Sequence, residues 1–158
     1  MSLKLEIEQE LVRVQALGAG GLLAIDLPSG RLEVVLTAVD AIGCAFETCT
    51  FTTPQLAGAT IESLKKLSAA LTARLSYLLE PISLIEADAL SSTVQLRSSP
   101  PQQSDDGRSY YELVVTKGGH LQLCRYLKAT GQMRQIVPAQ VTRQVLARLG
   151  EDFVAVIG

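Results

Sequence analysis

A leucine-rich stretch over residues 56–78 is the feature that most constrains how this chain can fold. Its apolar residues recur at intervals of three and four, the spacing of an amphipathic helix. Thr53 and Pro54 precede it as a start signal, because proline lacks the N–H group that the first helical turn leaves unpaired. Pro81 lies just beyond it, where a helix is expected to have ended. The pattern predicts one long helix over about 54–79.

Strand-like segments lie before this helix. Residues 3–14 alternate apolar and charged side chains with a period of two, which is typical of a half-buried strand. Residues 22–27 and 31–39 flank the turn signal Pro28-Ser29-Gly30, which favours a tight hairpin. Residues 44–52 are rich in β-branched and aromatic side chains. The first third of the chain is therefore predicted to be a strand meander.

The second half of the chain repeats this alternation of strands and helix. Residues 99–108 contain two prolines and few apolar side chains, which predicts a mobile loop. Pro138 is read as opening a shorter C-terminal helix over about 138–149, with Gly150 ending it before a last strand at 152–157. The other strand-like segments are 82–88, 92–98, 109–117, 120–127 and 132–137.

Length and composition fit one globular domain. A chain of 158 residues can bury a sizeable core, and with no Trp and few aromatic residues that core must be built from aliphatic side chains. We therefore expect a single α+β domain over residues 1–158, in which an antiparallel strand meander packs on one long helix and a shorter C-terminal helix follows.

Charge is unevenly distributed along the chain. The net charge is −2, yet no carboxylate occurs between Glu112 and Glu151 while six Lys or Arg do. Such a segment is a candidate surface for an anionic partner.

Within that segment, Gly118-Gly119 is predicted to be a two-residue hairpin turn. This register places Lys117 opposite His120 and pairs Glu112 with Arg125, an ion pair expected to be structural. It also points Leu121 and Leu123 toward the core.

The other side of the predicted hairpin would form a basic ribbon. Cations and stacked aromatic rings of this kind could hold an anionic ligand or single-stranded nucleic acid. A solvated sheet face is the simpler interpretation of the same residues. The candidate ligand-binding residues are Lys117, His120, Gln122, Tyr111, Tyr126, Lys128 and Arg134.

Few residues suggest catalysis. One His and three scattered Cys offer no metal-ligand spacing, and no G-x-S-x-G motif is present. His120, Tyr111 and Glu112 are the only grouping that the register could assemble into an acid–base set. No catalytic residue, cofactor or metal is predicted, and an enzyme is the less favoured interpretation.

These observations favour a non-enzymatic, adaptor or chaperone-like protein-interaction module that forms a homodimer or binds another protein. The odd number of Cys and the absence of a signal or membrane-spanning pattern favour a soluble cytoplasmic protein. The alternative is a ligand-binding protein that uses a pocket between helix and sheet, or the basic ribbon.

Overall fold

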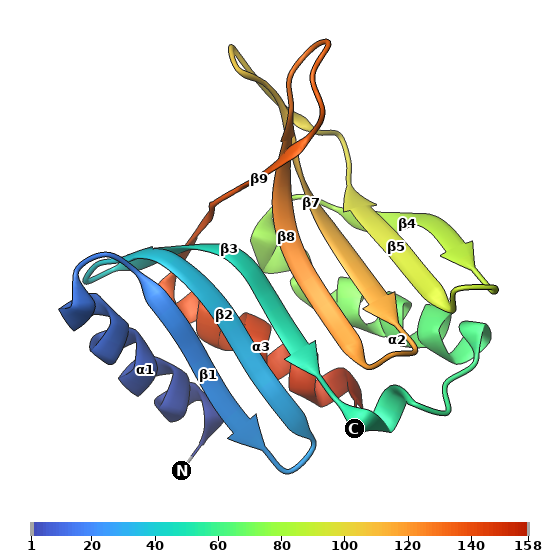
Figure 1. Ribbon diagram of the computed structural model, residues 1–158, viewed down its shortest axis with the longest axis horizontal. Coiled ribbons are helices and arrows are strands. Elements are labelled where there is room, and N and C mark those ends of the chain that lie inside the picture. The colour runs from blue at the N-terminus through green and yellow to red at the C-terminus, as the bar shows by residue number, and fades with distance from the viewer. Residues whose placement is uncertain (1, 158) are drawn as a thin grey trace.

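The structure, a computed structural model, describes residues 2–157 as one antiparallel sheet with helices on one of its faces. Figure 1 shows α1, α3 and α2 side by side behind the sheet, whereas no helix crosses its front, which we call the open face. The helices are α1 (Leu3–Leu17), α2 (Ile61–Arg74) and α3 (Arg143–Ile157), with the 3-10 turns η1 (Pro54–Leu56) and η2 (Leu75–Leu78) on either side of α2. The strands are β1 (Gly21–Leu27), β2 (Gly30–Val39), β3 (Gly43–Thr52), β4 (Ile82–Asp88), β5 (Thr93–Ser98), β6 (Gln102–Ser104), β7 (Gly107–Thr116), β8 (His120–Lys128), β9 (Gln135–Val137) and β10 (Ala139–Thr142). The α+β class, with an antiparallel meander, is confirmed.

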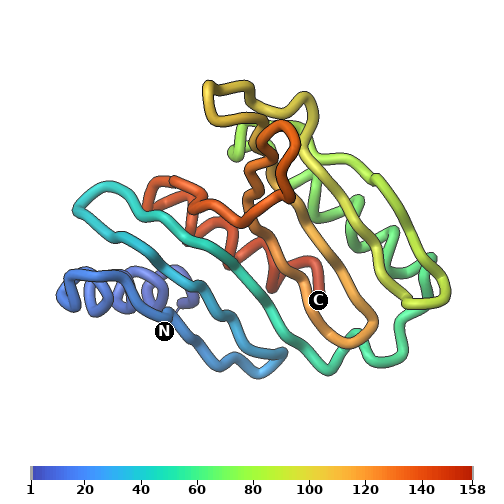
Figure 2. Tube along the Cα trace, turned by 45° about the horizontal axis from the view of Figure 1, so that its top comes forward, coloured from blue at the N-terminus to red at the C-terminus, as the bar shows by residue number. Residues whose placement is uncertain are grey.

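The main path of the sheet is β1-β2-β3-β8-β7-β5-β4, so β1 and β4 are its two edge strands. β3 and β8 pair only over part of their lengths. Residues 48–52 of β3 pair with β8, whereas residues 43–46 pair with β10. β9 pairs with residues 125–127 of β8, so β9 and β10 fill the fork where the two long strands diverge (Figure 2).

The first element is a helix, and the predicted strand over residues 3–14 is wrong. Ile7, Leu11 and Val14 are buried, a spacing of four and three that places them on one helical face. The Ser2 hydroxyl accepts the N–H of Leu5 at the start, and Gly18 ends the helix with a φ of 83°. The alternation of apolar and charged residues was compatible with either period over so short a run.

The predicted helix over 54–79 is divided into three parts. The Thr53 hydroxyl caps η1 as expected, but α2 begins only at Ile61, after a capping box between Thr60 and Ser63. Thr60 supplies a second helix start because Ala57–Ala59 turn out of the helical path. Leu64, Leu71 and other leucines of the segment are buried against the sheet, as their spacing predicted.

The C-terminal helix is displaced from its predicted bounds of 138–149. Pro138 lies between β9 and β10, and the helix begins after Thr142, whose hydroxyl accepts the N–H of Val145. Residues 152–157, predicted as a strand, continue α3. Gly150 does not end it: a Cβ there would lie 2.8 Å from Ile7 Cδ1 and 3.1 Å from Leu32 Cδ2, so the glycine allows α3 to approach α1 and the sheet.

The core lies between the helices and the sheet. All three Phe of the chain, Phe46, Phe51 and Phe153, are fully buried there, with aliphatic side chains around them. The predicted loop over 99–108 includes β6, which pairs with the start of β7. Among residues 2–157, no helix combines the length and apolarity needed to cross a membrane.

Candidate functional site

The β7–β8 hairpin carries most of the candidate residues, and its turn has three residues, Lys117 to Gly119. Thr116 pairs with His120, and the register continues through Leu113 with Leu123 to Tyr110 with Tyr126. The two-residue turn predicted from Gly118-Gly119 is therefore wrong by one position. Such a shift leaves the facing of β8 unchanged but reverses every side chain of β7 relative to it.

The side chains of β8 lie as predicted. Leu121 and Leu123 are fully buried against the helices, and His120, Gln122 and Tyr126 alternate with them on the open face. Gln122 is within hydrogen-bonding distance of Thr50, 3.2 Å between Oε1 and Oγ1, on the neighbouring strand.

The side chains of β7 lie on the opposite faces from those predicted. Tyr111 is buried on the helix side, where its ring is 4.7 Å from the Arg125 guanidinium carbon. Glu112 is on the open face with His120. The grouping of His120, Tyr111 and Glu112 as an acid–base set is not assembled, because Tyr111 is separated from the other two by the sheet.

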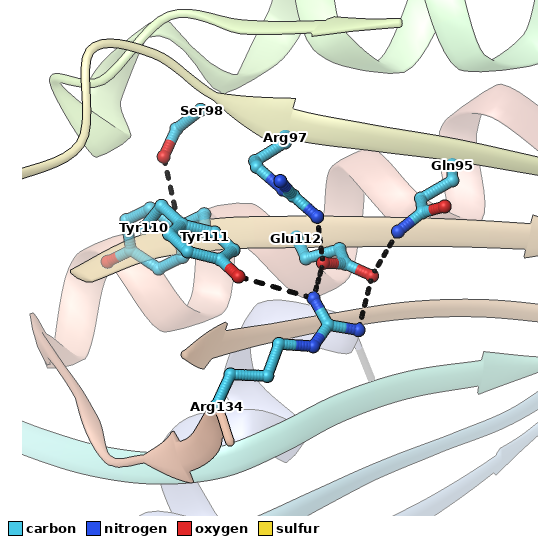
Figure 3. A network of polar contacts seen from close by, with 7 residues as sticks. All are labelled: Gln95, Arg97, Ser98, Tyr110, Tyr111, Glu112 and Arg134. Carbon is cyan, nitrogen blue, oxygen red and sulfur yellow. Dashed lines mark hydrogen bonds and ion pairs between the residues drawn. The ribbon is translucent and has the colours of Figure 1, made fainter. Parts of the chain in front are cut away.

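Glu112 is the centre of a polar cluster on the open face (Figure 3). One carboxylate oxygen accepts from Gln95 Nε2 at 2.8 Å and from Arg134 Nη2 at 3.3 Å. The other accepts from Arg97 Nη2 at 3.5 Å and from Arg134 Nη1. Glu112 is buried, with its side chain 3% exposed, although it lies on the face that no helix covers. The predicted ion pair of Glu112 with Arg125 is wrong, and Arg97 and Arg134 take Arg125's place.

Two tyrosines complete the Glu112 cluster. Arg97 lies over the Tyr110 ring at 4.6 Å, and Arg134 lies over the Tyr126 ring at 3.8 Å. The hydrogen bond that Arg134 donates to the Glu112 carboxylate is the main reason that the pKa of Arg134 is raised. Arg134 comes from the segment joining β8 to β9, so it fixes that segment to the sheet while it covers the carboxylate.

The hydrogen bonds within the Glu112 cluster limit the proton transfer and anion binding that its side chains can carry out. Each oxygen of Glu112 already accepts two hydrogen bonds, which leaves little capacity to take a proton from a substrate. Arg134, a candidate for anion binding, is engaged in the bidentate contact with Glu112. Lys128, another candidate, donates to the carbonyls of Ala129 and Gln132 in its own loop. The structure therefore brings Tyr126 and Arg134 together as part of an internal network.

A second polar junction lies on the helix side of the same strands. Arg125 Nη1 is 2.9 Å from Glu80 Oε2, and Arg125 Nη2 donates to Ser109 Oγ at 3.0 Å. Ser98 donates to the other Glu80 oxygen and accepts the backbone N–H of Tyr111. This junction fixes the segment after η2 to the sheet.

An exposed apolar surface lies beside that junction, at residues that the sequence pattern does not single out. On edge strand β4, Leu84 and Ile85 are adjacent and both are exposed, at 48% and 52%, and a bulge interrupts the pairing with β5 at this point. Leu79 is 88% exposed at the end of η2. A shallow groove of about 530 Å³ runs from the small side chains of α2 to the start of β4. We call these parts together the β4 surface: Leu79, Leu84 and Ile85 with the α2 flank of Ala69, Thr72, Ala73 and Ser76.

Only one part of the β4 surface could be predicted from the sequence. The small residues on one flank of the helix were visible in the sequence, but the exposure of Leu84 and Ile85 depends on β4 being an edge strand. Comparisons of the chain with models of protein families, with curated proteins and with solved structures found no match.

Proposed function

We propose that this protein is a non-enzymatic protein-interaction module that forms a homodimer through the β4 surface. The observation that carries the proposal is the exposure of Leu84 and Ile85 side by side on a strand with an unpaired edge. An edge strand presents unpaired N–H and C=O groups, and natural proteins usually protect such edges with lysines, prolines or covering segments. Residues 82–85 carry no charge and no proline.

Charge complementarity favours a second copy of the chain as the occupant. If two β4 strands meet antiparallel about a two-fold axis at Leu84 and Ile85, Glu86 of one copy lies opposite Ser83 of the other. Asp88 then lies beyond the opposing strand's first residue, so carboxylates do not face one another. Like charges directly opposite would destabilise the pairing.

The α2 flank supplies further contact area. A stable interface buries about 800 Å² on each partner, more than one short strand provides. The exposed small side chains Ala69, Ala73 and Ser76 let another backbone approach closely beside the strand.

A cytoplasmic location belongs to the same proposal. Cys44, Cys49 and Cys124 are free and buried, as expected of a protein from a reducing compartment.

Light scattering at tens of micromolar protein tests the dimer. Wild type is expected to have the mass of two chains, and Ile85→Lys that of one, because the substitution places a charge at the centre of the contact. Val35→Lys is the matched control, since Val35 is also exposed but lies on the open face of β2. A wild-type protein that stays monomeric, or an Ile85→Lys variant that stays dimeric with a native circular dichroism spectrum, contradicts the proposal.

A further inference from the structure

The two edges of the sheet are not equivalent. β1 and β4 each have one side without a strand partner among the described residues, so either could extend the sheet by pairing with another chain. A molecule with two competent edges can add copies at both ends and form open chains, whereas one competent edge closes at two copies.

At β1, a side chain of α1 occupies the outward backbone. Arg13 Nη2 donates to the carbonyl oxygen of Leu22 at 2.7 Å. Residues 22, 24 and 26 alternate along β1, and in an antiparallel strand such residues direct their backbone groups to the same side. Arg13 therefore takes one of the acceptors that a partner strand would need, near the start of that row. Its guanidinium also stands where the partner's backbone would lie.

Glu10 holds Arg13 in this position. Arg13 Nε and Nη2 contact the two carboxylate oxygens of Glu10 at 2.9 and 3.1 Å, one turn earlier on the same helix. This pairing is the main cause that lowers the pKa of Glu10, and the backbone N–H of Ala24 contributes to the same shift.

The β4 edge has no side chain of the described residues bonded across it in this way, and its protection is limited to the bulge between Leu84 and Glu86 and to the charges of Glu86 and Asp88. Among residues 2–157, no side chain makes a hydrogen bond to the backbone of residues 82–87, and no helix side chain bridges along that strand. The contrast is between an edge with an arginine bonded to it and an edge with exposed Leu84 and Ile85.

We infer that Arg13, held by Glu10, masks the β1 edge and limits assembly of this protein to two copies. The partner that the mask excludes is the β1 strand of another copy. The limit of two rests on the proposed dimer through β4, whereas the masking of β1 does not depend on it.

Four proteins test the inference by light scattering over a range of concentrations: wild type, Arg13→Ala, Ile85→Lys and the combined variant. Arg13→Ala is expected to exceed the mass of two chains as concentration rises, because both edges are then free. The combined variant is expected to form dimers through β1 alone. Lys4→Ala is the matched control, since Lys4 is an exposed cation on α1 that makes no hydrogen bond to β1. It is expected to leave the mass unchanged.

The outcomes separate the two proposals. If wild type is monomeric but Arg13→Ala dimerises, the dimer through β4 is wrong and the mask stands. If Arg13→Ala has the mass of wild type and the combined variant has the mass of Ile85→Lys, each with a native circular dichroism spectrum, the mask is wrong. Arg13→Gln, which keeps a polar side chain on the helix, provides a second variant in case the alanine protein fails to fold.

Discussion

Glu80 and Arg125 form an ion pair between the helix layer and the sheet, with 2.9 Å between Oε2 and Nη1 and both side chains about nine-tenths buried. Glu80 lies between η2 and β4 in the chain. Arg125 is on β8, which β7 and β5 separate from β4 in the sheet. The pair therefore fixes the position from which β4 starts, and with it the geometry of the β4 surface.

Removing one member of this pair should destabilise the protein strongly. Arg125→Ala leaves the Glu80 carboxylate in a largely dry site, which costs about 3 kcal/mol of unfolding free energy. Urea denaturation followed by circular dichroism measures the loss. Arg31→Ala is the control, because Arg31 pairs with the exposed carboxylates of Asp26 and Glu33, where solvent screens the charges, and its loss should be much the smaller of the two. Equal losses in the two variants would show that the buried pair has no special role.

Glu112 should hold the segment between β8 and β9 in place. Glu112→Ala leaves Arg97 and Arg134 without their shared carboxylate, and we expect a loss of about 3 kcal/mol, the lower end for a buried pair because both arginines can turn to solvent. Hydrogen exchange of the Val137 amide in β9, which pairs with Arg125 of β8, should accelerate more than that of amides in β5. Glu86→Ala, at an exposed carboxylate on β4, is the control and should change neither quantity. Unchanged exchange in β9 would mean that Arg134 does not restrain the segment.

The two glycines of the hairpin turn should differ in their tolerance of a side chain. Gly119 has a φ of 108°, and a Cβ there would lie 2.5 Å from the carbonyl oxygen of Thr53. Gly119→Ala is therefore expected to destabilise by at least about 2 kcal/mol. Gly118→Ala meets nothing closer than 3.7 Å and should lie within about 0.5 kcal/mol of wild type. Thermal denaturation of the two variants checks this, and similar losses would contradict the three-residue turn.

The same turn shows how far sequence could predict the site. The hairpin and the inward facing of Leu121 and Leu123 followed from the apolar alternation of β8. The faces of β7 could not be predicted, because apolar and polar residues do not alternate regularly around Tyr111, Glu112 and Val115. The sequence of β7 therefore does not favour one register over the other. The choice is made by the contact of Gly119 with Thr53, whose N–H donates to the Gly119 carbonyl 66 residues away in sequence. No local pattern records a contact of that kind.

The prediction of the helices failed for a related reason. Gly150 is a helix stop in most sequence contexts, yet here it lies inside α3 because Ile7 and Leu32 leave no room for a side chain. Leu3 to Ile7 alternates like a strand, and only the burial of Leu11 and Val14 resolves it as a helix. In both places the deciding contact joins elements distant in sequence, whereas the β1–β2 hairpin, which Pro28 and Gly30 indicate locally, was predicted correctly.

The buried cysteines should make the unfolding free energy of the protein decrease at alkaline pH. Burial raises the pKa of Cys49 to about 12 and that of Cys44 to about 11, both above the value of an unfolded thiol. The unfolded chain therefore loses these protons first, so stability is complete below about pH 8.5 and falls as pH rises toward the folded pKa values. Each such thiol lowers the unfolding free energy by at most about 1.4 kcal/mol per pH unit in that window. Urea denaturation at pH 8, 9 and 10 should show this decline, and Cys49→Ala, although less stable overall, should show a shallower one. A wild-type profile as flat as that of Cys49→Ala would mean that Cys49 ionises as readily in the folded protein as in the unfolded chain.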